Sequence, residues 1–365
     1  MAAIETAGAV TVSVIVPARN EEACLATCLT SLAAQSGVSF EIIVVNDHST
    51  DRTREIAKSF PGVRVVEAGP LPQGWTGKNN AVTTGARQAR GEWLLFTDAD
   101  TTHLPGSLAR ALEEAQSKGA ALLSYSPAQM VTGLLEKAVM PVIFAELASK
   151  YRPADVNDPK SSAAAANGQY ILITRAAYDA VGGHTAVSTS LLEDVDLARA
   201  VKQSGRGIYF RFGGDAVRTR MYRSWPQMRE GWTKNLAILF PSPVELAGRR
   251  LLEFLLLAAS FALLTLSFQT GHFLYAPLCL LMPVVTLTRI ARAHFSWDAN
   301  LLAPVGLLLF AYLLLRSKLS HRAGKVSWKG RTYGAKQDAA HDATADGQPG
   351  AKMRDHVPTT AGRIL

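Results

Sequence analysis

The chain has 365 residues, of which 48% are hydrophobic and 19% are charged, and its formal net charge is +8. Charged residues are scarcer than the roughly 25% of typical soluble domains, and the apolar excess lies after residue 240. No basic run is interleaved with aromatic residues, which argues against a nucleic-acid partner. Three cysteines (Cys24, Cys28 and Cys279) are too few for a disulfide framework. The N-terminus has no signal-peptide pattern, so we expect the first part of the chain to stay in the cytoplasm.

The first 120 residues alternate between strand and helix patterns. Strands are expected at 11–20, 40–47, 63–68 and 91–100, and helices at 21–35, 49–60 and 104–119, with a loop at 69–81 that turns into helix near Asn79. Asn20 is the expected N-cap of the first helix. This alternation predicts an α/β fold with a mostly parallel sheet flanked by helices. Ligands bind such sheets at the carboxyl ends of the strands, where this chain has Arg19, Asn20, Asp47, Asp98 and Asp100.

Beyond residue 120 the pattern is looser. An apolar helix is expected at 133–149, either buried or interfacial, followed by a loop at 151–168. The sequence then predicts a strand with a short helix at 169–183, a helix at 191–205 and strands within 207–222.

Three apolar segments follow, at 251–268, 273–288 and 299–315. Each is short for a bilayer core of ~30 Å, which needs about 20 residues, yet three in succession favour membrane helices over buried ones. Three full spans would put the basic tail outside, against the positive-inside rule, so we expect one segment to be re-entrant or interfacial. The predicted organisation is a tail (1–10), an α/β domain (11–240), a membrane region with two or three apolar helices (241–318), and a basic, then disordered, tail (319–365).

Asp98 and Asp100 end the apolar strand "WLLFTDAD". Residues i and i+2 of a strand point to the same side, so both carboxylates could meet one hard cation, Mg²⁺ or Mn²⁺. The alternative is a turn, in which Asp is common. Asp47 could bind a ribose hydroxyl or a base N–H, or could cap the next helix. No G-x-G-x-x-G follows the first strand, which disfavours a dinucleotide site.

Five motifs in order resemble those of family-2 inverting glycosyltransferases, over roughly residues 11–240. They are "VSVIVPARNEE" (12–22), "EIIVVNDHSTDRT" (41–53), "GWTGKNNA" (74–81), "WLLFTDAD" (93–100) and "LLEDVDLARAVKQSG" (191–205). The resemblance implies a GT-A fold, a nucleotide-sugar donor and a divalent metal, Mg²⁺ or Mn²⁺. It also implies that Asp47 contacts the nucleoside, that Asp98 and Asp100 meet metal and diphosphate, and that Asp194 is the catalytic base.

The same resemblance extends to a fuller set of site residues. The expected donor-binding residues are Pro17, Arg19, Asn20, Glu22, Asp47, Lys78, Asp98, Arg229 and Lys234, and the expected acceptor-side residues are Gly168, Gln169, Glu193 and Trp232. For Glu193, Asp194 and Asp196 the alternative is an acidic first turn that complements the helix dipole. "QMREGWTKN" (227–235) departs from the Q-x-x-R-W order of many members, which puts processive polymer synthesis in doubt.

Within the family, "GWTGKNNA", the stretch 133–149 and C-terminal apolar segments ending in "VSWKGRTY" are similar to bacterial hopene-associated and carotenoid-acid glycosyltransferases. The implied enzyme is multi-pass in the inner (plasma) membrane, with its catalytic domain in the cytoplasm and a lipid as acceptor. Alternatives are a polyprenyl-phosphate or polysaccharide glycosyltransferase and a non-enzymatic nucleotide-sugar-binding scaffold. Trp328, Lys329 and Arg331 either pack back on the active site or anchor at the headgroups. The oligomeric state is not predicted.

Overall fold

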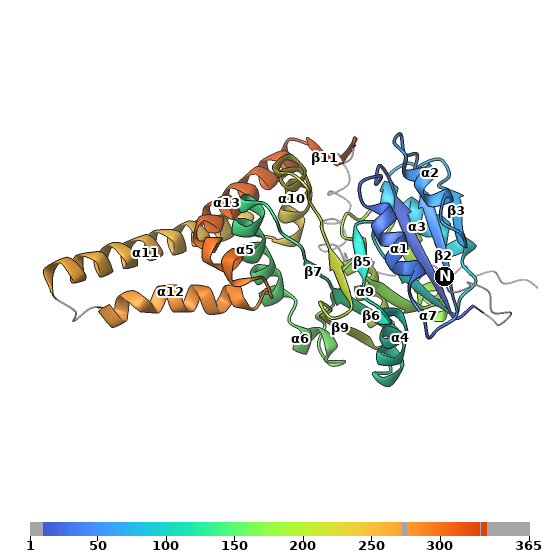
Figure 1. Ribbon diagram of the computed structural model, residues 1–365, viewed down its shortest axis with the longest axis horizontal. Coiled ribbons are helices and arrows are strands. Elements are labelled where there is room, and N and C mark those ends of the chain that lie inside the picture. The colour runs from blue at the N-terminus through green and yellow to red at the C-terminus, as the bar shows by residue number, and fades with distance from the viewer. Residues whose placement is uncertain (1–9, 272–275, 329, 334–365) are drawn as a thin grey trace, which may run out of the picture.

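The computed structural model describes residues 10–271, 276–328 and 330–333. Its centre is a seven-stranded sheet in the order β3-β2-β1-β4-β8-β6-β9 (Figure 1). Its strands are β1 (Val12–Ala18), β2 (Phe40–Asn46), β3 (Val63–Glu67), β4 (Trp93–Phe96), β6 (Leu122–Ser126), β8 (Ile171–Thr174) and β9 (Ile208–Phe212). β8 is antiparallel to both its neighbours, and the other pairs are parallel. The predicted mostly parallel sheet is therefore confirmed.

Helices cover both faces of this sheet, and alternate residues of each strand enter two separate cores. Val12, Val14 and Val16 of β1 pack with α1 and α4, whereas Ile15 packs with α3 and α9. Burial on both faces explains why the strands read as nearly continuous apolar runs. The helices of this domain are α1 (Leu25–Ala33), α2 (Thr53–Lys58), α3 (Gly77–Gln88), α4 (Ser107–Ser117), α6 (Pro153–Asn157), α7 (Arg175–Ala180), α8 (Gly183–Ala186) and α9 (Glu193–Gln203).

Two predicted helix starts differ from the structure. α1 begins at Leu25, and Asn20 does not cap it. Asn20 has a positive φ of 52°, and its side-chain oxygen accepts a hydrogen bond from the Thr50 N–H at 2.9 Å, so the amide serves the loop after β2 instead. α3 begins at Gly77 rather than near Asn79, because Thr76 caps it by accepting from the Asn79 N–H at 3.1 Å.

A second, small sheet lies beside the ends of the first. It has the order β5-β10-β7, with β5 (Thr101–His103), β10 (Val217–Thr219) and β7 (Ala128–Gln129). The sequence patterns indicated neither β5 nor β7, because two or three residues are too few for a visible alternation. β5 and β10 pair antiparallel, which joins the chain just after Asp100 to the segment that leads into α10.

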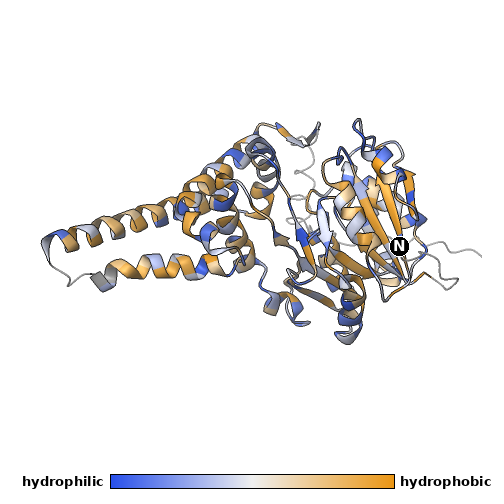
Figure 2. Ribbon diagram, viewed as in Figure 1, coloured by the Kyte–Doolittle hydropathy of each residue, from blue (hydrophilic) through white to orange (hydrophobic). Residues whose placement is uncertain are grey.

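The last part of the chain forms long apolar helices. They are α5 (Leu134–Lys150), α10 (Trp225–Leu239), α11 (Pro243–Thr270), α12 (Ala276–Ala291) and α13 (Trp297–Arg322). α11 and α12 project from the body as a pair of helices that is apolar along its length (Figures 1 and 2). Among the described residues, α11 and α13 are long and apolar enough to cross a membrane by length and composition, and α12 is shorter.

α13 packs closely on α5 instead of projecting with α11 and α12. A Cβ at Gly306 would lie 1.8 Å from the Ala138 carbonyl oxygen, so only glycine permits this approach of the two backbones. The middle of α5, from Val139 to Ile143, is buried in the same cluster. The helix expected at 133–149 is therefore mostly a buried one.

A short antiparallel hairpin follows α13, formed by β11 (Val326–Trp328) and β12 (Arg331–Tyr333). We call these residues the C-terminal strap. No sequence pattern indicated it. It lies against α10 and returns the chain to the main domain. The predicted disordered residues after 333 and the predicted tail 1–10, apart from Val10, lie outside the described residues.

Candidate active site

One open pocket of about 240 Å³ lies where β1, β2 and β4 end. It collects side chains from the strand ends, from the starts of α3 and α9, from α10 and from the C-terminal strap. Eleven of the residues expected from the sequence line it: Pro17, Arg19, Asp47, Lys78, Asp98, Asp100, Gly168, Gln169, Glu193, Asp194 and Lys234. Residues up to 217 positions apart in the sequence, from Pro17 to Lys234, thus share one cavity.

Four expected site residues do not line this pocket: Asn20, Glu22, Arg229 and Trp232. Glu22 accepts from the Arg52 N–H at 3.2 Å, so together with Asn20 it braces the loop after β2. Trp232 is 2% exposed, and its indole Nε1 lies 3.4 Å from the Met140 sulfur. The expected acceptor contact is thus replaced by a packing role between α10 and α5. Arg229 lies on α10 outside the pocket lining.

Lys78 is the cation at the centre of the pocket. The Thr76 cap fixes the start of α3, so the next turn carries Lys78 inward. Its Nζ lies 2.9 Å from Asp98 Oδ1 and 3.0 Å from Glu193 Oε1. Burial alone would lower the pKa of Lys78, but Asp98, Glu193 and Asp194 outweigh it and hold this pKa well above its usual value. Lys78 is therefore a fixed positive charge.

Asp194 lies in the first turn of α9 and faces Gly168. The Gly168 N–H donates to Asp194 Oδ2 at 2.8 Å, and the Val195 N–H donates to Oδ1 at 2.9 Å. A Cβ at Gly168 would come within 2.8 Å of Lys78 Nζ, so a bare glycine lets this loop approach the lysine. Burial, followed by the negative charge of Glu193, raises the pKa of Asp194 to about 6.

The pKa of Glu193 is shifted in the opposite direction from that of Asp194. Burial alone would raise the pKa of Glu193, but Lys78 and Lys234 outweigh it, and the pKa lies below its usual value. Two adjacent carboxyl groups with divergent pKa values are a recurrent arrangement in acid–base sites. Here one carboxylate stays paired with a lysine, while the other is poised to take a proton near neutral pH.

Asp98 and Asp100 line the pocket from the loop and turn that follow β4, which ends at Phe96 and not at Asp100 as the sequence predicted. Thr97 between the strand and Asp98 turns inward, and its hydroxyl donates to the Gln169 carbonyl at 2.8 Å. The described part of the chain has no group of three or more His, Cys, Asp or Glu side chains arranged for a metal. Two carboxylates fit Mg²⁺ or Mn²⁺ only if substrate phosphate oxygens complete the coordination, which is how magnesium is commonly bound.

Part of the pocket lining comes from residues that the sequence did not assign to the site, although two of them lie within the motif at 227–235. Met221, Tyr222, Gly231 and Asn235 line the pocket from the chain around α10. They carry no local signal, since only the packing of α10 on α5 and α13 brings them here. Thr76 could have been identified from the sequence, because a threonine three residues before Asn79 is a suitable N-cap for a helix that begins at Gly77.

The C-terminal strap completes the pocket with Trp328 and Arg331. Lys234 Nζ lies 5.6 Å from the centroid of the Trp328 ring, a cation–π distance. Of the two alternatives for this segment, the structure therefore favours packing against the active site for these two residues. Lys329 lies outside the described residues.

Comparison with solved structures finds proteins that bind nucleotides. A mannosyltransferase, PcManGT from Pyrobaculum calidifontis in complex with GDP-Man and Mn²⁺, is 18% identical, with a TM-score of 0.48 over 86% of this chain and 87% of that one. Glucosyl-3-phosphoglycerate synthase from Mycobacterium tuberculosis, in complex with Mn²⁺, UDP and phosphoglyceric acid, is 22% identical, with a TM-score of 0.43 over 64% and 78%.

Sequence comparison covers more of the chain at higher identity. Residues 13–181 match the family described as glycosyl transferase family 2. The 4,4'-diaponeurosporenoate glycosyltransferase of Staphylococcus aureus (strain MRSA252) is 30% identical over 337 residues, which is 88% of each protein. Its counterpart from strain bovine RF122 / ET3-1 is 29% identical over the same share. The chain therefore belongs to glycosyl transferase family 2 and is a glycosyltransferase with a GT-A fold.

Proposed function

We propose that this enzyme is a membrane-bound inverting glycosyltransferase that moves a sugar from a nucleotide-sugar donor to an apolar lipid such as a hopanoid or a carotenoid. The observation that carries the proposal is one pocket in which the Asp194 carboxylate, with its pKa raised to about 6, lies beside the cations of Lys78 and Lys234. Membership of the family excludes the non-enzymatic scaffold as the main function.

The donor is held by charge and by one carboxylate. Asp47 accepts hydrogen bonds from the nucleoside, and Lys78 and Lys234 face the diphosphate, whose oxygens pair well with ammonium groups. Asp98 and Asp100 would hold Mg²⁺ or Mn²⁺ together with diphosphate oxygens. When bound, the cation supplies neutralisation of the charge that develops on the leaving diphosphate.

Asp194 acts on the acceptor. Its carboxylate takes the proton of an acceptor hydroxyl while that oxygen attacks the anomeric carbon from the face opposite the leaving group, so the configuration inverts. The Gly168 and Val195 N–H groups hold the carboxylate in one orientation. A carboxylic acid acceptor, such as the one in the relative's name, is already ionised at neutral pH and has no proton for Asp194 to remove.

The lipid acceptor is supported by the apolar helices. The paired α11 and α12 expose leucine, valine and phenylalanine side chains that a bilayer would cover. At 1.5 Å per residue, the 16-residue α12 is about 24 Å long, enough to cross most of a hydrocarbon core of ~30 Å. At the base of the pair, Arg289 of α12 forms ion pairs with Glu146 of α5 at 2.5 Å and with Glu253 of α11 at 2.9 Å.

We further propose that α11 and α12 enter and leave the membrane on one side and that α13 does not cross it. The support is the contact of Arg331, which follows α13, with Asp47 in the catalytic pocket, since both must lie on one side. One face of α13 carries an exposed apolar stripe at helical spacing, which suits an interfacial position: Trp297, Leu301, Val305, Leu308, Tyr312, Leu315 and Leu319. The basic tail then stays on the catalytic side, in agreement with the positive-inside rule.

The proposal is tested with the full-length protein in lipid nanodiscs, Mn²⁺ and a panel of UDP- and GDP-sugars. Acceptors are a hopanoid alcohol, a carotenoid acid and a polyprenyl phosphate, and products are identified by mass spectrometry. We expect glycosylation of the hopanoid or the carotenoid. With a hydroxyl acceptor, Asp194→Asn should lower kcat by roughly 10²–10⁴-fold, the range for loss of a general base, with its circular dichroism unchanged. Transfer to the polyprenyl phosphate alone would contradict the lipid assignment.

A further inference from the structure

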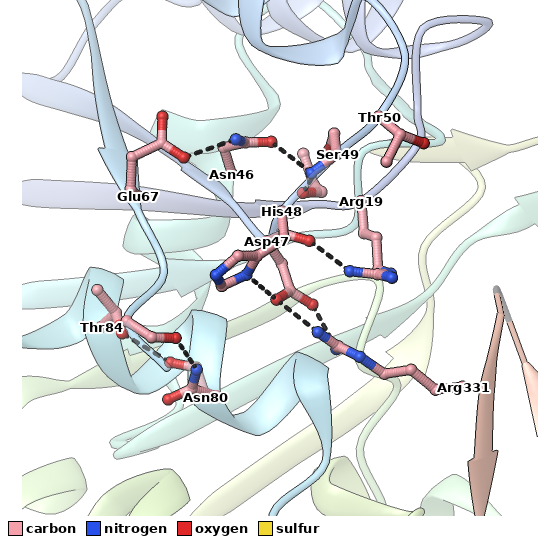
Figure 3. Close-up of polar contacts among 12 residues, drawn as sticks. Arg19, Asn46, Asp47, His48, Ser49, Thr50, Glu67, Asn80, Thr84 and Arg331 are labelled. Atoms are coloured by element: carbon pink, nitrogen blue, oxygen red, sulfur yellow. Dashed lines mark hydrogen bonds and ion pairs between the residues drawn. The ribbon is translucent and has the colours of Figure 1, made fainter. Parts of the chain in front are cut away.

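The C-terminal strap inserts one side chain into the donor pocket. Arg331 Nη1 lies 2.6 Å from Asp47 Oδ2, and Nη2 lies 2.9 Å from Asp47 Oδ1, so the guanidinium holds both carboxylate oxygens (Figure 3). The Asp47 side chain is only 5% exposed and the Arg331 side chain 20%. A two-pronged, largely buried pair of this kind is stronger than an exposed ion pair.

The pocket provides the space for this guanidinium. A Cβ at Gly77, the first residue of α3, would lie 1.4 Å from Arg331 Nη1 and 2.8 Å from Asp47 Oδ2. Glycine at this position therefore leaves room for the arginine beside the carboxylate. Lys78 follows directly, so a second cation of the pocket lies near the guanidinium. An anion entering this region is attracted by both cations.

Arg331 and a nucleoside need the same oxygen atoms. Asp47, in the role proposed above, accepts hydrogen bonds from the nucleoside, but both its carboxylate oxygens are occupied by Arg331. A nucleoside that approaches Asp47 from the pocket therefore competes with the guanidinium for these oxygens. A diphosphate in the same pocket offers the displaced guanidinium a second two-pronged anionic partner, since arginine pairs with phosphate and carboxylate alike.

The strap is a small element, and its movement would break the Arg331–Asp47 pair and uncover Val326, which is 1% exposed. Its two strands have three residues each, and on α10 it is held by contacts such as Ser327 Oγ to Glu230 at 3.1 Å and Trp328 against Lys234. Small elements with few buried contacts open at low free energy. Lys234 itself faces Glu193, Asp98 and Asp194, so the strap packs on a residue of the pocket wall.

We propose that Arg331 is a donor-binding residue that exchanges Asp47 for the donor diphosphate, so that the C-terminal strap closes over the bound nucleotide. The inference rests on the proposed function, in particular on Asp47 as the nucleoside contact. It makes the segment after the last apolar helix part of the donor site. It also predicts opposite effects of Arg331 on two ligands: the residue competes with an uncharged nucleoside and strengthens binding of the nucleoside diphosphate.

The experiment is isothermal titration of the full-length protein in nanodiscs with uridine, guanosine, UDP and GDP, in Mn²⁺. Arg331→Ala should weaken the nucleoside diphosphate that the wild type binds by at least about tenfold, as expected for loss of a charged hydrogen-bonded pair. The same variant should bind the matching nucleoside several-fold more tightly. Arg331→Lys keeps the positive charge but loses the two-pronged hydrogen bonding of the guanidinium. Its affinity for the nucleoside diphosphate should fall between those of the wild type and Arg331→Ala. Arg322→Ala, at the exposed end of α13, is the control and should match the wild type.

The outcomes distinguish a failure of the proposed function from a failure of the proposed Arg331 exchange. If the wild type binds neither diphosphate, the result contradicts the proposed nucleotide-sugar donor and not the role of Arg331 in particular. If the wild type binds one and Arg331→Ala binds it equally well, the exchange is overturned. Tighter binding of both nucleoside and diphosphate by Arg331→Ala also overturns it, because Arg331 would then only obstruct the pocket. A loss of both through misfolding is identified from circular dichroism, and Arg331→Lys then decides: weaker diphosphate binding with intact nucleoside binding supports the exchange, and unchanged binding overturns it.

Discussion

At the residue scale, the adjacent acids Glu193 and Asp194 have different partners and opposite pKa shifts. Glu193, Asp194 and Asp196 do form an acidic first turn of α9, as the capping alternative expected. The same turn, however, brings Glu193 to Lys78 and Asp194 to Gly168, while Asp196 bonds to Ser190. Sequence spacing could predict the acidic turn. It could not assign separate roles, because Gly168, which faces Asp194, lies 26 positions away, and Lys78, which pairs with Glu193, lies on α3.

The pH dependence of transfer tests the proposed role of Asp194 as the catalytic base. A base must be unprotonated, and the pKa of Asp194 is about 6, so kcat with a hydroxyl acceptor should fall as the pH drops through about 6. Glu193→Gln removes a negative charge that raises this pKa, so the acid limb of the pH profile should move to lower pH. Asp196→Asn, on the same turn but outside the pocket lining, should leave the limb in place. An acid limb that does not move in Glu193→Gln would refute the electrostatic coupling.

At the element scale, the start of α3 controls the position of Lys78. Thr76→Ala removes the N-cap bond to the Asn79 N–H, which should lower the free energy of unfolding by about 1 kcal/mol. Because Lys78 lies in the same turn, the donor KM should rise as well. Urea unfolding and steady-state kinetics measure the two effects.

A matched cap exists outside the pocket. Thr174 caps α7 by accepting from the Ala177 N–H at 3.2 Å, and it does not line the pocket. Thr174→Ala should cost a similar free energy of unfolding while the donor KM stays at the wild-type value. Equal changes in KM for both variants would mean that the Thr76 effect is only global destabilisation.

At the scale of the whole molecule, the contact between Arg331 and Asp47 supports the proposed membrane topology. Ser327→Cys should react with a membrane-impermeant maleimide from the same side of sealed vesicles as Arg52→Cys, which marks the catalytic domain. Both positions are exposed, and the native cysteines Cys24, Cys28 and Cys279 are buried, so background labelling should be low. Labelling of position 327 only from the opposite side would show that α13 crosses the membrane.

The sequence by itself determined the alternating strands and helices, the mostly parallel sheet and eleven of the pocket residues. The physical reason for the elements is local: apolar periodicity sets each element, and the end of each parallel strand falls at one edge of the sheet. Pocket residues away from these strand ends, such as Gly168 and Asp194, were expected from the resemblance to family-2 glycosyltransferases. Asn20 was assigned to the site from its place at a strand end, and Glu22, Arg229 and Trp232 from motif order. Neither kind of evidence tells a residue that lines a cavity from one that braces its wall.

Only the tertiary structure decided how the last third of the chain relates to the site. Composition identified three apolar segments, but the close packing of Gly306 on Ala138 separates α13 from the projecting α11 and α12. The strap reaches Asp47 from 284 residues away in the chain, and its strands are too short to leave a periodic pattern. Contacts of this range depend on where long helices begin and end in space, and no local window of sequence contains that information.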